Sequence, residues 1–434
     1  MDGEPITAST LKERIEAGEE RAGVAVALEG TIPSQLTQLV GGLAVALALN
    51  RTLWIAGGKR TDSLLHWIDL PLELQAQRIQ RIPTEVENMP GVTLISPSTI
   101  SSNVNKLGGP IVSRGPGAEF QERQRANNYV GSLIKCNFHP SRHHLLILRV
   151  PFYLGHWAYA GAPHLSAVVP DGDLYGPLAR YLLRPKLEVV APIRALVQNY
   201  LGPATSKGHG AFTVGLSIRT MYGRGHTGVL SAQVAANSVV EQCINQHEDL
   251  QALRDRIGDD PTRLRFYAGT LREAARQKLA ADLAPHPVHW FGDGVHLQDS
   301  GHVSMSLAEA RNLTAADHAA AALVNIMLLA VSDELIVSPG SEAGLVAARI
   351  GSRLPLLMAS QGDRCDRARK FEPPVDGTHG EEARMFVCMP LTPAPTPQPT
   401  MAPEVQQWQN AGVDPHNGFE FDSKSDDYDS GVPF

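Results

Sequence analysis

The chain lacks the sequence features of several common protein classes. It has no basic tract long enough to follow a nucleic-acid backbone, and its formal net charge is −7, so we expect no nucleic-acid partner. Its longest apolar run, residues 39–49, contains two glycines and is too short to span a bilayer. We therefore expect a buried helix at this position and no membrane segment in this chain.

Cysteine is scarce. The four cysteines, Cys136, Cys243, Cys365 and Cys388, form no C-x-x-C pair, and none belongs to a cluster with zinc-site spacing. Four scattered thiols fit two disulfides or none, and their spacing does not decide between these. Scarce cysteine and an apolar content of 43% describe an ordinary globular chain.

A metal hydrolase is one alternative that the histidines suggest. Two groups of side chains come close together in the sequence: His139, His143 and His144, and Asp293, His296, Asp299 and His302. No H-x-x-x-H pattern on a predicted helix, and no zinc pattern, supports either group. We expect no metal and no cofactor.

Buried strands alternate with helices along most of the chain. In the first half, a strand at 24–28, a helix at 33–49 and a strand at 52–55 form a β-α-β unit, which is typical of a parallel sheet covered by helices. Further elements are predicted as strands at 92–95 and 144–150 and helices at 174–183 and 189–201. A glycine-rich stretch at 202–210 then marks a boundary.

A second series of the same kind follows the boundary. We predict strands at 213–219, 264–268, 287–291, 334–338 and 354–358, and helices at 229–247, 270–283, 314–331 and 341–350. The expected fold class is α/β, with two facing Rossmann-like, doubly wound domains. The predicted parts are an N-terminal helix (1–22), the two domains (23–202 and 211–390) and an extended, mostly disordered proline-rich and acidic tail (391–434).

The strand at 213–219 ends in Arg219 and Thr220, just before a glycine-bearing loop. Arginine suits two-point binding of phosphate or carboxylate, and ligands of open α/β sheets lie beyond the carboxyl ends of the strands. The functional interpretation is an anion clamp. The plain alternative is a surface arginine after an ordinary strand.

The turn at 338–341, Ser-Pro-Gly-Ser, leads from the predicted strand at 334–338 into a helix that begins near Glu342. A helix start carries partial positive charge, and small residues around Ser341 let a phosphate approach the backbone closely. Ordinary capping by Ser341 explains the same residues. Because Arg219 belongs to the same domain, the combination favours a nucleotide diphosphate site.

Four segments, in this order, resemble the plant-type xyloglucan fucosyltransferase family, which is related to other GDP-fucose-using transferases. They are LVGGLAVALALNRTLWI (39–55), the region 136–185 with YGPLARYLLRP near its end, VGLSIRT (214–220), and residues 325–351 with the turn described above. The resemblance extends over about residues 23–390.

The resemblance implies a GT-B fold and an inverting glycosyltransferase that moves fucose from GDP-fucose to a galactose hydroxyl of a glycan, without a metal. The acceptor would bind in domain 23–202 and the donor in domain 211–390. Arg219 would be the catalytic residue that binds the donor diphosphate. The implied donor-binding residues are Arg219, Thr220, Asn325, Ser338, Ser341, Glu342 and Gly344. The family also implies the Golgi lumen. Since no signal anchor is visible in the sequence, we expect a soluble form or an incomplete start.

This chain departs from the family pattern at the donor segment. Glu342 replaces a threonine, and a carboxylate beside a diphosphate would repel it unless the side chain points away. Asn325 stands where the family has a glutamate, and Ser217 replaces a glutamine. These changes motivate a second hypothesis, a non-catalytic relative that binds a glycan or nucleotide.

A general base for the acceptor hydroxyl has no clear position in the sequence. The candidates in predicted loops are His226, Asp293, Asp299 and His302, and each is equally typical of a turn or a solvated surface.

Substitution of Arg219 tests the anion clamp. Arg219→Ala should cost about 2–4 kcal/mol of transition-state stabilisation, because it removes a charged donor from the departing diphosphate. Single-turnover transfer from GDP-fucose measures this effect. A variant that keeps near-normal turnover would remove Arg219 from the site.

Overall fold

The computed structural model describes a defined part of the chain, and the statements below concern that part. It comprises residues 23–57, 64–75, 78–79, 82, 84–89, 91–96, 145–149, 174–198, 211–218, 239–245, 263–269, 273–291, 315–338, 341–358 and 365–368, with residues 9, 10, 12, 13, 248, 250, 251 and 255. The predicted tail at 391–434 and the boundary at 202–210 lie outside these ranges. Of the predicted N-terminal helix, the described residues 9, 10, 12 and 13 are helical.

The first half of the chain forms a five-stranded sheet, which we call the N-terminal sheet. Its strands are β1 (Gly23–Ala27), β2 (Thr52–Ala56), β3 (Arg78–Ile79), β4 (Val92–Ile95) and β5 (Leu145–Leu148). They lie in the order β3-β2-β1-β5-β4, and every neighbouring pair is parallel. Because β1 and β5 are parallel neighbours, the residues that follow them lie at the same edge of the sheet, the edge at which open α/β sheets bind ligands. The predicted strands of this half are confirmed.

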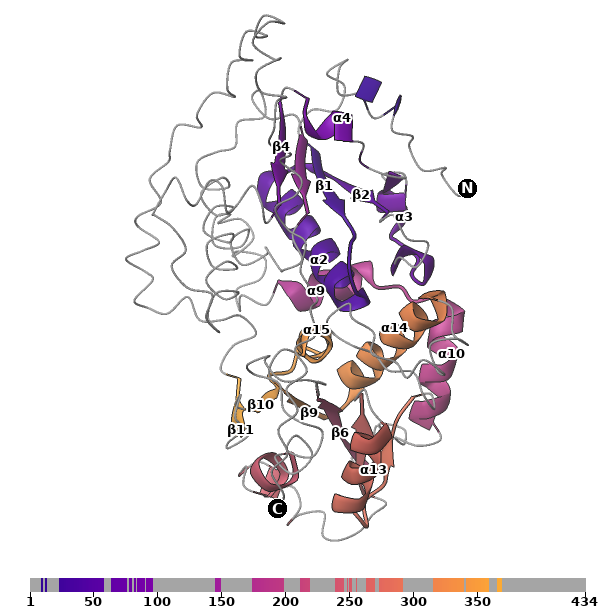
Figure 1. Ribbon diagram of the computed structural model, residues 1–434, viewed down its shortest axis with the longest axis vertical. Helices are drawn as coiled ribbons and strands as arrows, with labels where there is room; N and C mark the ends of the chain where they lie inside the picture. Colours follow the sequence, from indigo (N-terminus) through magenta and orange to yellow (C-terminus); the bar gives the residue numbers. More distant parts are fainter. Residues whose placement is uncertain are drawn as a thin grey trace, which may run out of the picture. The chain divides into compact units, whose positions relative to one another are not determined.

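Helix α2 (Ile32–Leu49) follows β1 and packs on the sheet (Figure 1). Thr31 Oγ1 accepts from the backbone N–H of Ser34 to begin the helix, and Asn50 ends it with a left-handed backbone (φ 52°). By length and composition α2 is apolar enough to cross a membrane, but 83% of its apolar window is buried in the structure. The prediction of a buried helix here is confirmed.

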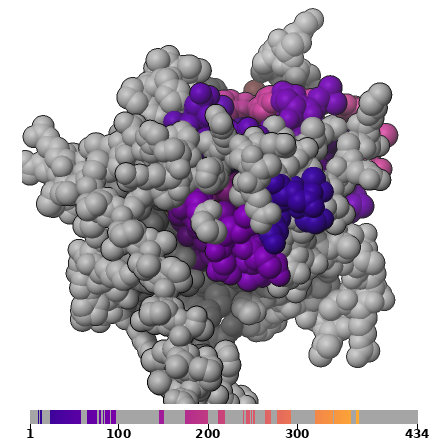
Figure 2. All heavy atoms as spheres, turned by 90° about the horizontal axis from the view of Figure 1, so that it is seen from above, coloured from indigo at the N-terminus to yellow at the C-terminus, as the bar shows by residue number. Residues whose placement is uncertain are grey.

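Smaller elements complete this half. Helices α9 (Tyr175–Leu182) and α10 (Leu187–Leu196) match the predicted pair. The short elements η1 (Leu64–His66), α3 (Leu72–Gln75) and α4 (Thr84–Glu87) were not among the predicted elements. In the view of Figure 2, residues of the purple segments reach the surface, with pink residues of the α9–α10 region at the edge.

The second half forms a six-stranded sheet, the C-terminal sheet. Its strands are β6 (Phe212–Ser217), β7 (Leu264–Ala268), β8 (Val288–His289), β9 (Glu334–Val337), β10 (Leu356–Met358) and β11 (Cys365–Arg367). Their order is β11-β10-β9-β6-β7-β8, and only the β10–β11 pair is antiparallel. Five of these strands were predicted, and the edge strand β11 was missed. Two parallel, helix-covered sheets confirm the predicted fold class.

Different helices cover the two faces of the C-terminal sheet. Helices α14 (Ala315–Val331) and α15 (Glu342–Ile350) pack on the face that bears Tyr267, Leu335 and Val337. The π-helix η3 (Val239–Ile244) and α13 (Glu273–Asp282) contribute apolar side chains to the opposite face. Of the helix predicted at 229–247, only the part from residue 239 onward falls within the described residues.

One apolar cluster joins the two sheets. It contains Val24 and Leu146 of the N-terminal sheet, Leu335 of the C-terminal sheet, and buried side chains of α2, α9, α14 and α15. Burial of this kind contributes about 25 cal/mol per Å² of apolar surface removed from water. The helices between the sheets therefore belong to a single core.

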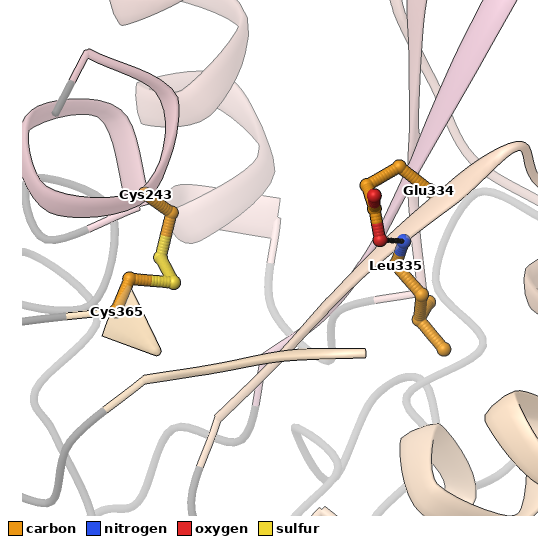
Figure 3. The surroundings of a disulfide bond; sticks show 4 residues. All are labelled: Cys243, Glu334, Leu335 and Cys365. Atoms are coloured by element: carbon orange, nitrogen blue, oxygen red, sulfur yellow. Dashed lines mark hydrogen bonds between the residues drawn. A yellow bond between two sulfur atoms is a disulfide. The ribbon is translucent and has the colours of Figure 1, made fainter. Parts of the chain in front are cut away.

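A disulfide links the edge strand β11 of the C-terminal sheet to η3. Cys243 on η3 bonds to Cys365 on β11, across 122 residues of sequence (Figure 3). Beside it, Arg367 Nη2 lies 2.8 Å from Glu334 Oε2, so β11 is also held to β9 by charge. The sequence left the cysteine pairing open, and Cys136 and Cys388 lie outside the described residues.

Removal of this disulfide should destabilise the fold. Cys243→Ala, Cys365→Ala and the double variant should each lose about 3–5 kcal/mol of unfolding free energy, because the bond closes a long loop in the unfolded chain. Urea unfolding followed by circular dichroism measures the loss. Since each single variant breaks the same bond, the three should nearly coincide. Single variants with the wild-type urea midpoint would contradict the assignment.

Candidate functional site

Three buried serines gather where β6 and β9 end and α15 begins. Ser217, Ser338 and Ser341 are each 2% exposed. The Oγ atoms of Ser217 and Ser341 lie 2.8 Å apart, and the backbone N–H of Ser338 donates to the carbonyl oxygen of Ser217 at 3.0 Å. Ser341 is the N-cap of α15, as predicted, since its Oγ accepts from the backbone N–H of Gly344. The start of α15 is thus fixed at the carboxyl ends of the two inner strands.

Gly344 allows α15 to approach the sheet this closely. A Cβ atom at this position would lie 2.7 Å from the Cβ of Ser217 and 2.9 Å from Cγ1 of Val337. Side-chain carbons do not pack at such distances without displacement of the backbone. The first turn of α15 therefore depends on both a glycine at 344 and a small residue at 217.

Glu342, the first residue of α15, turns toward the N-terminal half of the chain. Ser34 Oγ, in the first turn of α2, donates to Glu342 Oε2 at 2.9 Å. A carboxylate is favourable in the first turn of a helix because of the partial positive charge there. The hydrogen bond to Ser34 gives the side chain a partner across the two halves. Glu342 replaces a threonine of the family pattern, and its carboxylate points toward Ser34 of α2.

The other end of α15 also contacts the N-terminal half. Arg180 of α9 donates through Nη1 to the carbonyl oxygen of Ile350 at 3.0 Å and to Ser352 Oγ at 2.6 Å. The guanidinium of Arg349 lies 5.0 Å from the ring centroid of Tyr175. Burial raises the pKa of Tyr175 to about 12, although nearby Arg349 opposes the shift, so this phenol stays neutral at physiological pH. Cations at this end complement the helix dipole.

Asn325 belongs to α14, and its side chain is buried in the core. Its Oδ1 accepts from the hydroxyl of Tyr267 on β7, and its Nδ2 donates to the carbonyl oxygen of Ala321 at 2.9 Å. Asn325 is only 6% exposed. Both ends of the amide therefore have protein partners, and its predicted contact with a nucleotide remains a prediction.

The structure brings together four of the predicted donor residues, Ser338, Ser341, Glu342 and Gly344, at the start of α15. Arg219 and Thr220 lie outside the described residues. So do the predicted base candidates and both histidine groups considered for a metal. Within the described ranges, no three His, Cys, Asp or Glu side chains form a possible metal site.

The sequence reasoning missed the polar loop between β1 and α2. Glu29 follows the end of β1, and its backbone N–H donates to Gln38 Oε1 at 2.8 Å. Gly30 has a left-handed backbone (φ 84°), and its carbonyl oxygen accepts from Gln35 Nε2 at 3.0 Å. The available sequence signal for this ordered loop was a glycine in the strand-to-helix turn, followed by two glutamines early in the next helix.

A guanidinium lies beside this loop. Arg149 follows β5, and its Nη1 lies 3.6 Å from Glu29 Oε1, while its Nη2 forms an ion pair with Glu87. The Glu29 side chain is 53% exposed, whereas that of Glu87 is 14% exposed. An accessible carboxylate thus lies at the carboxyl ends of the neighbouring strands β1 and β5.

No known family model and no curated protein matches this sequence. Among solved structures, the fold is similar to that of a point mutant of Arabidopsis thaliana FUT1 in complex with GDP, with a TM-score of 0.53 and 13% identity. That match covers 84% of this chain and 79% of the other. Fucosyltransferase NodZ from Bradyrhizobium is similar with a TM-score of 0.45 and 15% identity, over 76% of this chain and 91% of that chain. POFUT1 in complex with GDP gives 0.38 and 10%, over 77% and 95%. The likeness to FUT1 shows a shared fold.

Gly344→Ala tests the close approach of α15 to the sheet. The added methyl group should cost about 1–3 kcal/mol of unfolding free energy, because it overlaps Ser217 and Val337. Urea unfolding measures this cost. In Ser217→Gly/Gly344→Ala the overlap with Ser217 is removed, so part of the loss should return. A Gly344→Ala protein as stable as the wild type would refute the packing argument.

Proposed function

We propose that this chain is an inverting glycosyltransferase that transfers fucose from GDP-fucose to a galactose hydroxyl of a glycan. One observation carries the proposal: the start of α15 is fixed at the carboxyl ends of β6 and β9, within a fold similar to that of a GDP-bound fucosyltransferase. In open α/β sheets this is the position at which a helix N-terminus binds phosphate. The motif resemblance at residues 214–220 and 325–351 supports the same donor.

The diphosphate is proposed to bind against the backbone of the first turn of α15. Ser338 and Ser341 are almost completely buried and support the turn, whereas Glu342 and Ala343 in the first turn are partly exposed and would present their backbone to the diphosphate. Arg219, which follows β6 in sequence, is proposed to supply the positive charge. Glu342, held by Ser34, directs its own negative charge toward α2.

The chemistry requires stabilisation of a leaving group. As the bond between the sugar carbon and the diphosphate breaks, the sugar becomes oxocarbenium-like and negative charge grows on the departing GDP. Arg219 and the positive end of α15 would bind that charge more strongly in the transition state than in the ground state. No metal is required in this scheme, because the protein's own groups balance the charge.

The acceptor and the compartment complete the proposal. We propose that the N-terminal sheet binds a galactose-containing glycan of the cell-wall type, as the motif resemblance implies. The Golgi lumen is proposed as the compartment, and the Cys243–Cys365 disulfide supports it because such bonds persist in oxidising compartments.

Calorimetric titration of the purified chain tests the donor. GDP and GDP-fucose should bind without metal and unchanged by EDTA, while GDP-mannose and UDP-galactose should bind more weakly or not at all. Transfer from GDP-fucose to galactose-ended glycans then tests the enzyme. GDP binding without turnover would instead support the second hypothesis, a non-catalytic nucleotide-binding relative, which the replacements at Asn325 and Glu342 favour. Absence of all guanine-nucleotide binding would refute the donor site.

Glu342→Gln examines the charge at the start of α15 in the same titration. The variant should bind GDP about fivefold more tightly, about 1 kcal/mol, because it removes a like charge near the diphosphate. Glu85→Gln removes an equal charge from an exposed position on α4 and should leave the Kd for GDP unchanged. Equal effects of the two variants would place the diphosphate elsewhere.

A further inference from the structure

The proposed transferase needs a group to take the proton of the acceptor hydroxyl. That group must be an accessible base, and it must lie where the acceptor glycan meets the bound GDP-fucose. The four base candidates from the sequence lie outside the described residues. Within the described residues, Glu29 is an accessible carboxylate at the carboxyl ends of β1 and β5 in the N-terminal sheet.

Glu29 is held by its backbone while its side chain remains accessible. Gln38 fixes the N–H of Glu29, and Gln35 fixes the carbonyl of the next residue. Both glutamines lie on the buried helix α2 and are nearly covered, at 5% and 6% exposure. The Gln35 amide also accepts from the backbone N–H of Leu64 at 2.8 Å, which ties the loop to η1. Catalytic groups are effective when rigid elements hold them in this way.

The same loop is connected to the proposed donor site. Thr31, two residues after Glu29, caps α2, and its Oγ1 lies 3.1 Å from Ser34 Oγ. Ser34 in turn donates to Glu342 at the start of α15. A continuous chain of three hydrogen-bonding side chains therefore leads from the turn that carries Glu29 to the helix end that would bind the leaving group.

Two other carboxylates among the described residues near Glu29 and the start of α15 have partners that occupy them. Glu87 is mostly buried and forms its ion pair with Arg149, and Glu342 accepts from Ser34. Arg149 is also 3.6 Å from Glu29, and an arginine keeps its charge at all relevant pH values. It can orient the carboxylate of Glu29 but cannot itself accept a proton.

We propose that Glu29 is the general base of the transfer. Its carboxylate accepts the proton of the acceptor hydroxyl as the oxygen forms its bond to the anomeric carbon of fucose. The bond from that carbon to the diphosphate oxygen breaks at the same time, and its electron pair leaves with GDP. The products are the fucosylated glycan, GDP and protonated Glu29, which then returns its proton to solvent. This inference rests on the proposed function.

Glu29→Gln tests the base, with Glu87→Gln as the matched control. Both variants remove one carboxylate beside Arg149, but only that of Glu29 is exposed enough to meet an acceptor hydroxyl. Glu29→Gln should lower kcat about 10²- to 10⁴-fold, while the Kd for GDP should stay within about twofold. Glu29→Asp should retain more activity than Glu29→Gln.

Several results would overturn the proposal. A wild-type kcat in Glu29→Gln would do so. An equal loss of kcat in Glu87→Gln would also do so, because both substitutions would then act by displacing Arg149. Loss of GDP binding in Glu29→Gln would assign the residue to structure or donor binding. Wild-type protein that binds no guanine nucleotide, or binds GDP without transfer, refutes the proposed function itself, and that result appears before any Glu29 variant is measured.

Discussion

The position of α15 depends on polar contacts at both of its ends with the N-terminal half of the chain. Ser34 of α2 bonds to the carboxylate in its first turn, and Arg180 of α9 donates to a carbonyl oxygen in its last turn. Each contact matches the sign of the helix dipole at that end, so the electrostatic terms reinforce each other. The helix that carries the candidate phosphate site is thus positioned by both halves of the protein.

Small side chains make this placement possible. Ser217 and Gly344 allow the backbone of α15 to approach β6 and β9, and Ser341 closes the turn by capping the helix. Larger residues at these positions would move the helix start away from the strand ends. The departure from the family pattern at Ser217 therefore has a structural reason in this chain: its hydroxyl pairs with the capping serine, and its size fits beside the glycine.

The sequence predicted the elements whose signals are local. The capping role of Ser341 and the apolar runs of the inner strands can be identified within a few residues, and both were found. Strand β11 was missed because Cys365–Arg367 has no apolar alternation, and it is held by a distant disulfide and an ion pair. The bond between Ser34 and Glu342 joins residues 308 positions apart, and no local pattern encodes such a contact. For the same reason Glu29 was not a candidate until its loop could be seen beside β5.

The apolar cluster shared by the two sheets has a consequence for how such a protein can change over time. Helices α2, α9, α14 and α15 contribute side chains to one core, so a volume change on one helix alters the packing of the others. Two halves that met only across solvent could exchange partners by recombination and each retain its fold. Here a hybrid that joined one half to the corresponding half of a distant relative would bring together surfaces that had not adapted to each other. Changes that preserve this core would therefore accumulate in surface loops such as the one between β1 and α2, rather than through exchange of whole halves.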